Sequence, residues 1–128
     1  MRSPRLVSVI LGKTMQPLNG STIFRGDQEV VRIKVVEPEQ LGATLRFVAR
    51  LFVDHPNGSV QVIKSGLDFT TNINESGNVL LAEMKLLSSD TDHFLEKTRL
   101  IYDLERTIGS DITTLEQGVF ALVPDVAI

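Results

Sequence analysis

Two histidines and three aspartates have the side chains best suited to proton transfer or metal binding in this sequence. His55 lies in a Pro-Asn-Gly turn and His93 lies far from it, so the two lack the spacing of a metal-binding pair. Asp54, Asp90 and Asp92 could offer carboxylate oxygens to Ca²⁺, but an Asp-x-Asp pair is short of a calcium loop and fits a helix cap better. The chain contains no cysteine, which excludes thiolate chemistry and disulfides. We therefore expect no catalytic residue, no metal site and no cofactor, and hence no enzyme.

Other motifs with known chemistry are short or incomplete. The tripeptide 25–27 (Arg-Gly-Asp) matches an integrin-binding motif, but glycine and aspartate are also ordinary turn residues. The sequence has no glycine-rich phosphate loop and no Gly-x-Ser-x-Gly nucleophile turn. Arg46 and Arg50 share one face of an expected strand, and Arg32 and Lys34 are candidates for the same face, but no aromatic residues are interleaved with them. We therefore expect this basic face to be solvated or to border a protein interface, with no nucleic-acid partner.

The composition is that of one folded domain with an aliphatic core. The chain has 128 residues, of which 42% are hydrophobic, with six phenylalanines, one tyrosine and no tryptophan. A chain of this length buries about 65–70% of the surface that its unfolded form exposes. The net charge of −3 provides no general attraction to nucleic acid or to anionic membranes. The apolar run 6–11 is too short for a signal peptide or a membrane span, so we expect no membrane partner.

The segment from Thr98 to Pro124 predicts an antiparallel hairpin. Leu100, Tyr102 and Leu104 alternate with mostly polar residues, and a second alternating stretch follows a Gly-Ser turn. Tyr102 is therefore expected on the inward row of the first strand. The second stretch predicts one row of Thr113, Leu115, Gln117 and Val119, opposite a row of Thr114, Glu116, Gly118 and Phe120.

The rest of the chain indicates further short strands separated by turns. Turns about every 8–12 residues are typical of a sandwich or a barrel. The stretch 79–84 could also form a helix, but its position between two turns favours a strand. A break in the alternation over 88–96 predicts one short helical turn, with Ser89 as a candidate cap. The expected strands lie at 6–11, 31–36, 44–53, 60–64, 67–73 and 79–87.

The order of several short motifs resembles a known family of domains. The motifs are Phe24–Asp27, Leu41–Phe47, Ser89–Thr91, Tyr102–Leu104, Thr113–Leu115, Gln117–Phe120 and Val123–Val126. Over residues 22–126 this order resembles the small immunoglobulin-like β-sandwich domain at the N-terminus of phage baseplate upper proteins and of related phage and prophage structural proteins. The chain departs from that pattern at Gln40 and Leu41, which stand where the pattern has an acidic residue and a threonine.

The resemblance implies an all-β fold, an immunoglobulin-like antiparallel β-sandwich, and a non-enzymatic structural role in a bacteriophage particle. Residues 22–128 would form the sandwich, and residues 1–21 an N-terminal arm or a first strand. The partners would be other virion proteins of the tail, baseplate or adaptor region, in a virion assembled in the cytoplasm of the host bacterium. Two alternatives stay open, a capsid decoration or cement protein and a carbohydrate-binding β-sandwich module.

Two apolar groups are candidates for subunit contacts. Val48 and Phe52 fall on the otherwise polar face of the long strand, where they either contact another subunit or are covered by a loop of the same chain. The run 6–11 can pair with an exposed sheet edge of its own chain or of a neighbour. We therefore expect a homo-oligomer or a stable complex. The candidate interface residues are Leu6, Val7, Val9, Ile10, Leu11, Val48 and Phe52.

Overall fold

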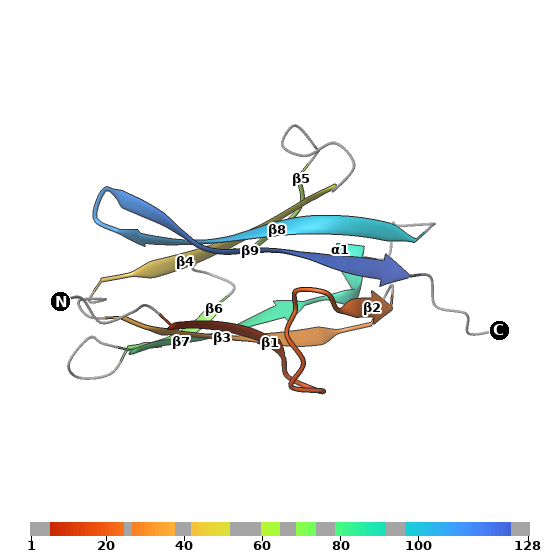
Figure 1. Cartoon of the computed structure of the whole chain (residues 1–128), viewed down its shortest axis with the longest axis horizontal. Helices are drawn as coiled ribbons and strands as arrows, with labels where there is room; N and C mark the ends of the chain where they lie inside the picture. The colour runs from red at the N-terminus through yellow and green to blue at the C-terminus, as the bar shows by residue number, and fades with distance from the viewer. Residues whose placement is uncertain are drawn as a thin grey trace.

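Two β-sheets pack face to face in the computed structural model, which describes residues 6–24, 27–37, 42–51, 60–64, 69–73, 79–91 and 97–123 (Figure 1). The elements in chain order are β1 (Leu6–Leu11), β2 (Thr22–Phe24), β3 (Glu29–Val36), β4 (Thr44–Leu51), β5 (Val60–Lys64), β6 (Phe69–Ile73), β7 (Val79–Leu86), α1 (Ser88–Thr91), β8 (Thr98–Ile108) and β9 (Asp111–Val123). One sheet has the order β1-β3-β7-β6 and the other β2-β9-β8-β4-β5. The described strand pairs are antiparallel except β2 with β9. The predicted immunoglobulin-like antiparallel β-sandwich is confirmed.

The core between the sheets is mainly aliphatic because alternate residues of each strand point inward. Val31, Ile33 and Val35 of β3 are at most 2% exposed, and the inward residues of β7 and β8 are at most 4% exposed. At the centre of the core, the ring of Tyr102 stacks on Phe47 with centroids 5.3 Å apart and lies 6.0 Å from the ring of Phe120. The expected inward position of Tyr102 is confirmed.

The hairpin of β8 and β9 turns at Gly109 and Ser110 and contains one bulge. Gly109 has a positive φ of 60°, which glycine adopts without the steric cost of a side chain. The register changes from Leu104 opposite Glu116 to Glu105 opposite Thr114, so Leu115 is an extra residue on β9. The predicted alternation, which runs without interruption from Thr113 to Phe120, is therefore wrong at this bulge. Leu115 faces the core, and beyond the bulge the inward positions are Gly118, Phe120 and Leu122.

The first strand belongs to the protein's own sheet. β1 pairs with β3 from Leu6 opposite Val36 to Leu11 opposite Val31. Val9, Leu11 and Leu18 are buried in the common core. In the described part of the 1–21 segment, which begins at Leu6, the structure shows a first strand and no separate arm, and the chain from β1 to Leu18 shares its core with the rest of the sandwich.

The connection from β1 to β2 crosses from one sheet to the other and is tied to β9. The amide N–H of Val119 donates to Oδ1 of Asn19 at 2.9 Å, and the amide N–H of Gly20 donates to the carbonyl of Val119 at 2.6 Å. Sequence alone missed β2, because a strand of three residues is too short to show alternation.

The short helical turn α1 is capped by Asp90. The amide N–H of Leu87 donates to Oδ2 of Asp90 at 2.7 Å, so this carboxylate reaches back to the residue before the turn, as in one half of a capping box. The expected cap, Ser89, is exposed. The cap comes from Asp90 because its side chain can reach the amide N–H that precedes the turn.

Candidate functional site

The residues singled out for chemistry do not form a site in the part of the chain that the structure covers. Asp54, His55, Asp92 and His93 lie outside the described residues. Among the described residues, no group of three or more His, Cys, Asp or Glu is placed to hold a metal ion. Asp90 is used as a helix cap, as above.

The Arg-Gly-Asp tripeptide lies largely outside the described residues. Of its members only Asp27 is described, and its amide N–H donates to the carbonyl of Phe24 at 3.2 Å, a turn contact.

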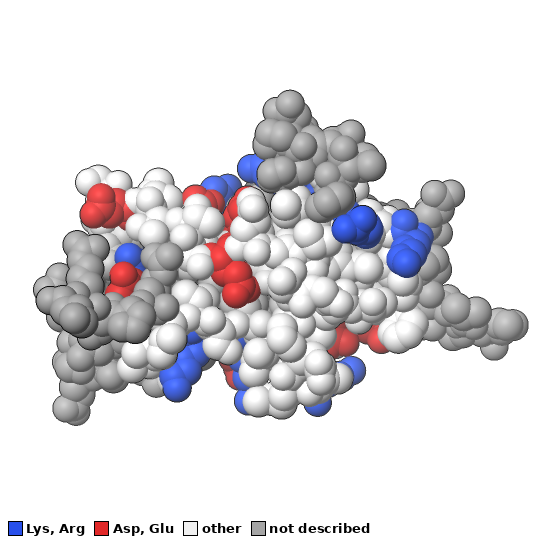
Figure 2. Space-filling model, in the orientation of Figure 1, with Lys and Arg blue, Asp and Glu red and all other residues white. Residues whose placement is uncertain are grey.

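The four basic residues predicted for one face lie on two different sheets. Arg46 and Arg50 are on β4, whereas Arg32 and Lys34 are on β3 of the opposite sheet, so the expected common face is wrong. Strand alternation assigns a residue to one side of its own strand but does not say which strands are neighbours. Arg46 forms an exposed ion pair with Glu105 at 3.8 Å. Figure 2 shows acidic and basic side chains scattered over one face of the molecule with uncharged areas between them.

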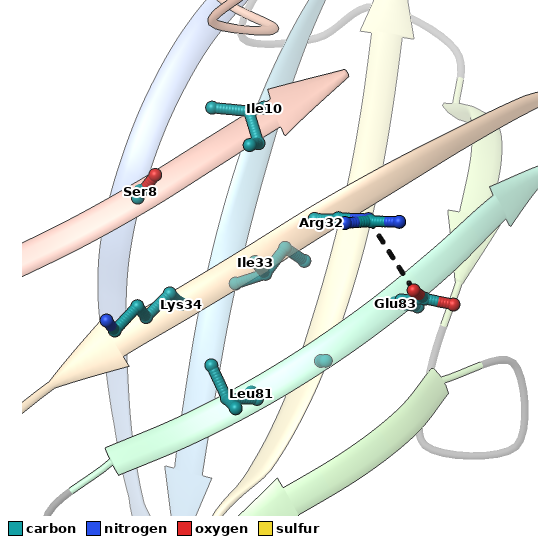
Figure 3. A pocket seen from close by; sticks show the side chains of 8 residues that line it. Ser8, Ile10, Arg32, Ile33, Lys34, Leu81 and Glu83 are labelled. Atoms are coloured by element: carbon teal, nitrogen blue, oxygen red, sulfur yellow. Dashed lines mark ion pairs between the residues drawn. The ribbon is translucent and has the colours of Figure 1, made fainter. Parts of the chain in front are cut away.

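On the outer side of the four-stranded sheet, three strands form a shallow hollow of about 490 Å³ (Figure 3). β1, β3 and β7 bring residues together there that are far apart in the sequence, because Ser8 is opposite Lys34, which is opposite Leu81. In the next row Ile10 is opposite Arg32, which is opposite Glu83. We call this surface the docking face and define it by Leu6, Ser8, Ile10, Arg32, Lys34, Leu81 and Glu83.

Aliphatic and charged side chains alternate on the docking face. Leu6 is 61% exposed and Leu81 is 41% exposed, although both belong to regular strands. Arg32 Nε lies 3.6 Å from a carboxylate oxygen of Glu83, and both side chains are about half exposed. Such an exposed pair contributes little to stability and can exchange partners. No described residue forms an ion pair with Lys34. The surface therefore combines exposed apolar area with a cation that has no described ion-pair partner.

The candidate interface residues divide between this face and the interior. Leu6 and Ile10 point outward into the docking face, and Val7 packs against the core. Val9 and Leu11 are buried, so their side chains are not at an outer surface. Val48 is only 2% exposed within the single chain. The structure therefore shows that its own chain covers it, as in the second of the two alternatives for this residue. Phe52 lies outside the described residues.

Sequence reasoning did not assign Arg32, Lys34, Leu81 and Glu83 to this face. One signal for Leu81 was present, because Leu80, Ala82 and Met84 form the inward row of the same strand and leave Leu81 on the other side.

Tyr102 and Glu116 form the one described hydrogen bond between a buried ring and a carboxylate. The hydroxyl of Tyr102 donates to Oε2 of Glu116 at 2.6 Å. Burial of the hydroxyl, and then the hydrogen bond to Glu116 and its negative charge, raise the pKa of Tyr102 far above its ordinary value. Tyr102 therefore stays protonated, and its place in the centre of the core gives it a packing role.

No described helix is long and apolar enough to cross a membrane.

No protein-family model and no curated protein matches the sequence. Several solved structures share the fold. The C-terminal domain of the AgI/II polypeptide BspA of Streptococcus agalactiae has a TM-score of 0.51 and 8% identity, over 94% of this chain and 50% of that one. The alkylpurine DNA glycosylase AlkC of Pseudomonas fluorescens has a TM-score of 0.50 and 8% identity, over 91% of this chain and 30% of that one. The chain thus spans half or less of the length of these two proteins.

A third structure is AggA, the major subunit of aggregative adherence fimbriae type I from Escherichia coli. It has a TM-score of 0.41 and 8% identity, with 98% of each chain covered. None of the three is a phage protein. At these identities the first two structures indicate a shared fold alone.

Proposed function

We propose that the chain is a non-enzymatic structural module of a bacteriophage particle, in the tail, baseplate or adaptor region, and that it holds other virion proteins through the docking face. The ordered motifs of the sequence support the phage assignment by resemblance. The observation that carries the assembly role is the set of aliphatic side chains exposed beside cations on the outer side of the four-stranded sheet.

The outer positions of a sandwich strand are normally polar, because they face water. Leu6 and Ile10 of β1 and Leu81 of β7 instead keep apolar surface at such positions, on either side of β3. Grouped apolar side chains with a charged border are typical of protein-binding surfaces, where their burial drives association. Arg32 adds a planar cation that can form two parallel hydrogen bonds to a partner's carboxylate.

The alternative of a carbohydrate-binding module is less well supported by the described aromatic side chains. Sugar sites usually stack the ring of a sugar on exposed aromatic rings. Phe47, Tyr102 and Phe120 are buried in the core, and Phe24 alone among the described aromatic side chains is exposed, at 49%. A capsid decoration role stays as the alternative within the phage reading, because it would use the same kind of surface.

Paired variants test the docking face. Leu81→Asp places a charge in the face, whereas Ile112→Asp makes the same change at an aliphatic residue that is 67% exposed at the tip of the β8–β9 hairpin. Both should fold, since both side chains are exposed. We expect Leu81→Asp protein to be lost from purified particles and Ile112→Asp protein to be retained. Incorporation of both variants at the level of the unchanged protein would refute the docking face.

Electron microscopy of particles that carry the protein tests the phage assignment itself. Density for the sandwich in the tail, baseplate or adaptor region would support the proposal, and density on the capsid surface would favour the decoration alternative. Absence of the protein from particles would refute both.

A further inference from the structure

The edge strand β1 exposes backbone groups along only half of its length. The amide N–H of Gly12 donates to the carbonyl of Val30 at 2.7 Å, which fixes the hydrogen-bonding phase of the β1–β3 pair. In an antiparallel pair this phase alternates, so the backbone groups of Leu6, Ser8 and Ile10 point toward β3. Those of Val7, Val9 and Leu11 therefore point away from β3, toward the open edge of the sheet.

The connection to β2 covers the second half of this edge. The amide N–H of Leu11 donates to the carbonyl of Gln16 at 2.8 Å, and the amide N–H of Met15 donates back to the carbonyl of Leu11 at 2.8 Å. The amide N–H of Leu18 donates to the carbonyl of Val9 at 3.0 Å. No described residue pairs with the N–H or the carbonyl of Val7, or with the N–H of Val9. The open half of β1 thus presents donors and acceptors in strand geometry.

The sequence of β1 does not protect this edge. Proteins usually block an exposed edge with a charged residue, a proline or a bulge. β1 reads Leu-Val-Ser-Val-Ile-Leu, with no charged residue and no proline, and its register with β3 is continuous. Only the half that the connection covers is closed.

We propose that the open half of β1 pairs with the same segment of a second copy of the chain, antiparallel and about a two-fold axis at Val7. The two copies would then share one continuous sheet of eight strands. Val7 is the self-complementary position, because its N–H and its carbonyl are both available, and each can pair with the same residue of the second copy. Since β1 carries no charge, the pairing opposes no like charges.

This register fixes which side chains meet. With Val7 opposite Val7, Leu6 of one copy lies opposite Ser8 of the other, on the outer side of the sheet. The 61% exposed side chain of Leu6 gains a neighbour there. The two docking faces would become one surface across the dimer. The pairing itself uses the backbone and does not depend on which protein the docking face binds.

The variant Val7→Pro tests the pairing of the strand edge without disturbing the fold of the monomer. Proline removes the N–H that points outward and leaves the hydrogen bonds to β3 intact, and an edge strand tolerates proline at such a position. We expect the unchanged protein to be dimeric by sedimentation and Val7→Pro protein to be monomeric with an unchanged circular dichroism spectrum. A monomeric unchanged protein up to millimolar concentration would overturn the proposal and leave this edge to a strand of another protein. A folded Val7→Pro dimer would overturn it as well.

Charge-paired variants test the register even if Val7→Pro prevents folding. Leu6→Lys with Ser8→Lys places like charges opposite each other twice in the dimer, whereas Leu6→Lys with Ser8→Glu places opposite charges there. We expect the first dimer to dissociate about tenfold more readily than the second, or more. Equal dissociation of the two would contradict the pairing.

Amide hydrogen exchange supplies an independent readout. The Val7 amide should become protected as protein concentration rises, whereas the Ser8 amide, which faces β3, should be protected at every concentration. Fast exchange of the Val7 amide in a dimer would show that the two copies meet elsewhere.

Discussion

Gly118 makes room for the ring of Tyr102, and the sandwich should not tolerate a methyl group there. The two residues are directly opposite in the β8–β9 pair. A Cβ atom at position 118 would lie 2.6 Å from the hydroxyl oxygen of Tyr102 and 2.7 Å from Cε1 and Cζ of its ring. The ring has little space to move away, because Phe47 and Phe120 pack against it.

Gly118→Ala should lower the free energy of unfolding by about 1.5–5.5 kcal/mol. Overpacking a core of this kind costs about 1–3 kcal/mol. A displaced Tyr102 hydroxyl would also lose its hydrogen bond to the carboxylate of Glu116, which adds about 1.5–3 kcal/mol. Gly118 does not have a positive φ, so alanine recovers about 0.4–1 kcal/mol by restricting the unfolded chain.

Urea unfolding measures this loss, and the single tyrosine of the chain, with no tryptophan present, makes its fluorescence a local probe. The control is Thr114→Ala, an exposed position of the same strand, which should change stability by less than about 0.5 kcal/mol. In a Tyr102→Leu background the ring and its fluorescence are gone, so unfolding is followed there, and in the unchanged background, by circular dichroism, and Gly118→Ala should then cost little. A loss of the same size in both backgrounds would refute the reasoning, because it would show that the ring is not what excludes the methyl group.

Three further predictions concern other contacts. Unfolded Tyr102 loses its proton near pH ~10, whereas the folded residue keeps it, so the free energy of unfolding should fall above that pH by up to about 1.4 kcal/mol per pH unit. Tyr102→Phe should remove this slope in alkaline unfolding titrations. Arg106→Met should lower the free energy of unfolding by about 1–3 kcal/mol in urea, because it leaves the partly buried carboxylate of Glu37 without its arginine partner. Adding Glu37→Met should recover part of this loss. Val48→Ala should lower the free energy of unfolding by about 1.5 kcal/mol in thermal unfolding, because Val48 is buried although it is on the outward row of β4. Thr44→Ala on the same row should cost under about 0.5 kcal/mol, and equal losses would contradict the burial of Val48.

Strand alternation predicted most of this fold because burial follows the same period of two residues. The long rows of β3, β4 and β7 each carry three or more inward aliphatic or aromatic residues, so their faces could be assigned without neighbours. The method fails where the period is interrupted. The bulge at Leu115 shifts the inward row of β9 by one residue, and such a shift depends on the pairing with β8.

The candidate site could not be predicted in the same way, because it depends on sheet order. Ser8, Lys34 and Leu81 come from strands separated by turns and other strands, and they meet only because β3 lies between β1 and β7. The sequence gives each side chain a face on its own strand. It does not say that β3 and β4 are in different sheets, which is why the four basic residues were expected together.

The two outer surfaces of the sandwich differ in a way that indicates which one meets partners. On the five-stranded sheet, polar side chains of neighbouring strands bind each other, since Gln117 Nε2 donates to Oδ1 of Asp103 at 2.9 Å and Arg46 pairs with Glu105. Val48 is buried on that side, and among the described aliphatic side chains of that sheet Ile112 at the hairpin tip is the large one that is exposed, which is normal for an isolated surface residue. On the four-stranded sheet, exposed aliphatic residues occur on β1 and β7, on either side of β3, beside a lysine with no described ion-pair partner and a strand edge that is half open. Apolar side chains, an available cation and unpaired backbone groups all favour association, and here they occur together on one sheet. If this sheet is the binding surface, then Leu81→Asp and Val7→Pro should impair assembly, whereas Ile112→Asp on the other sheet should not.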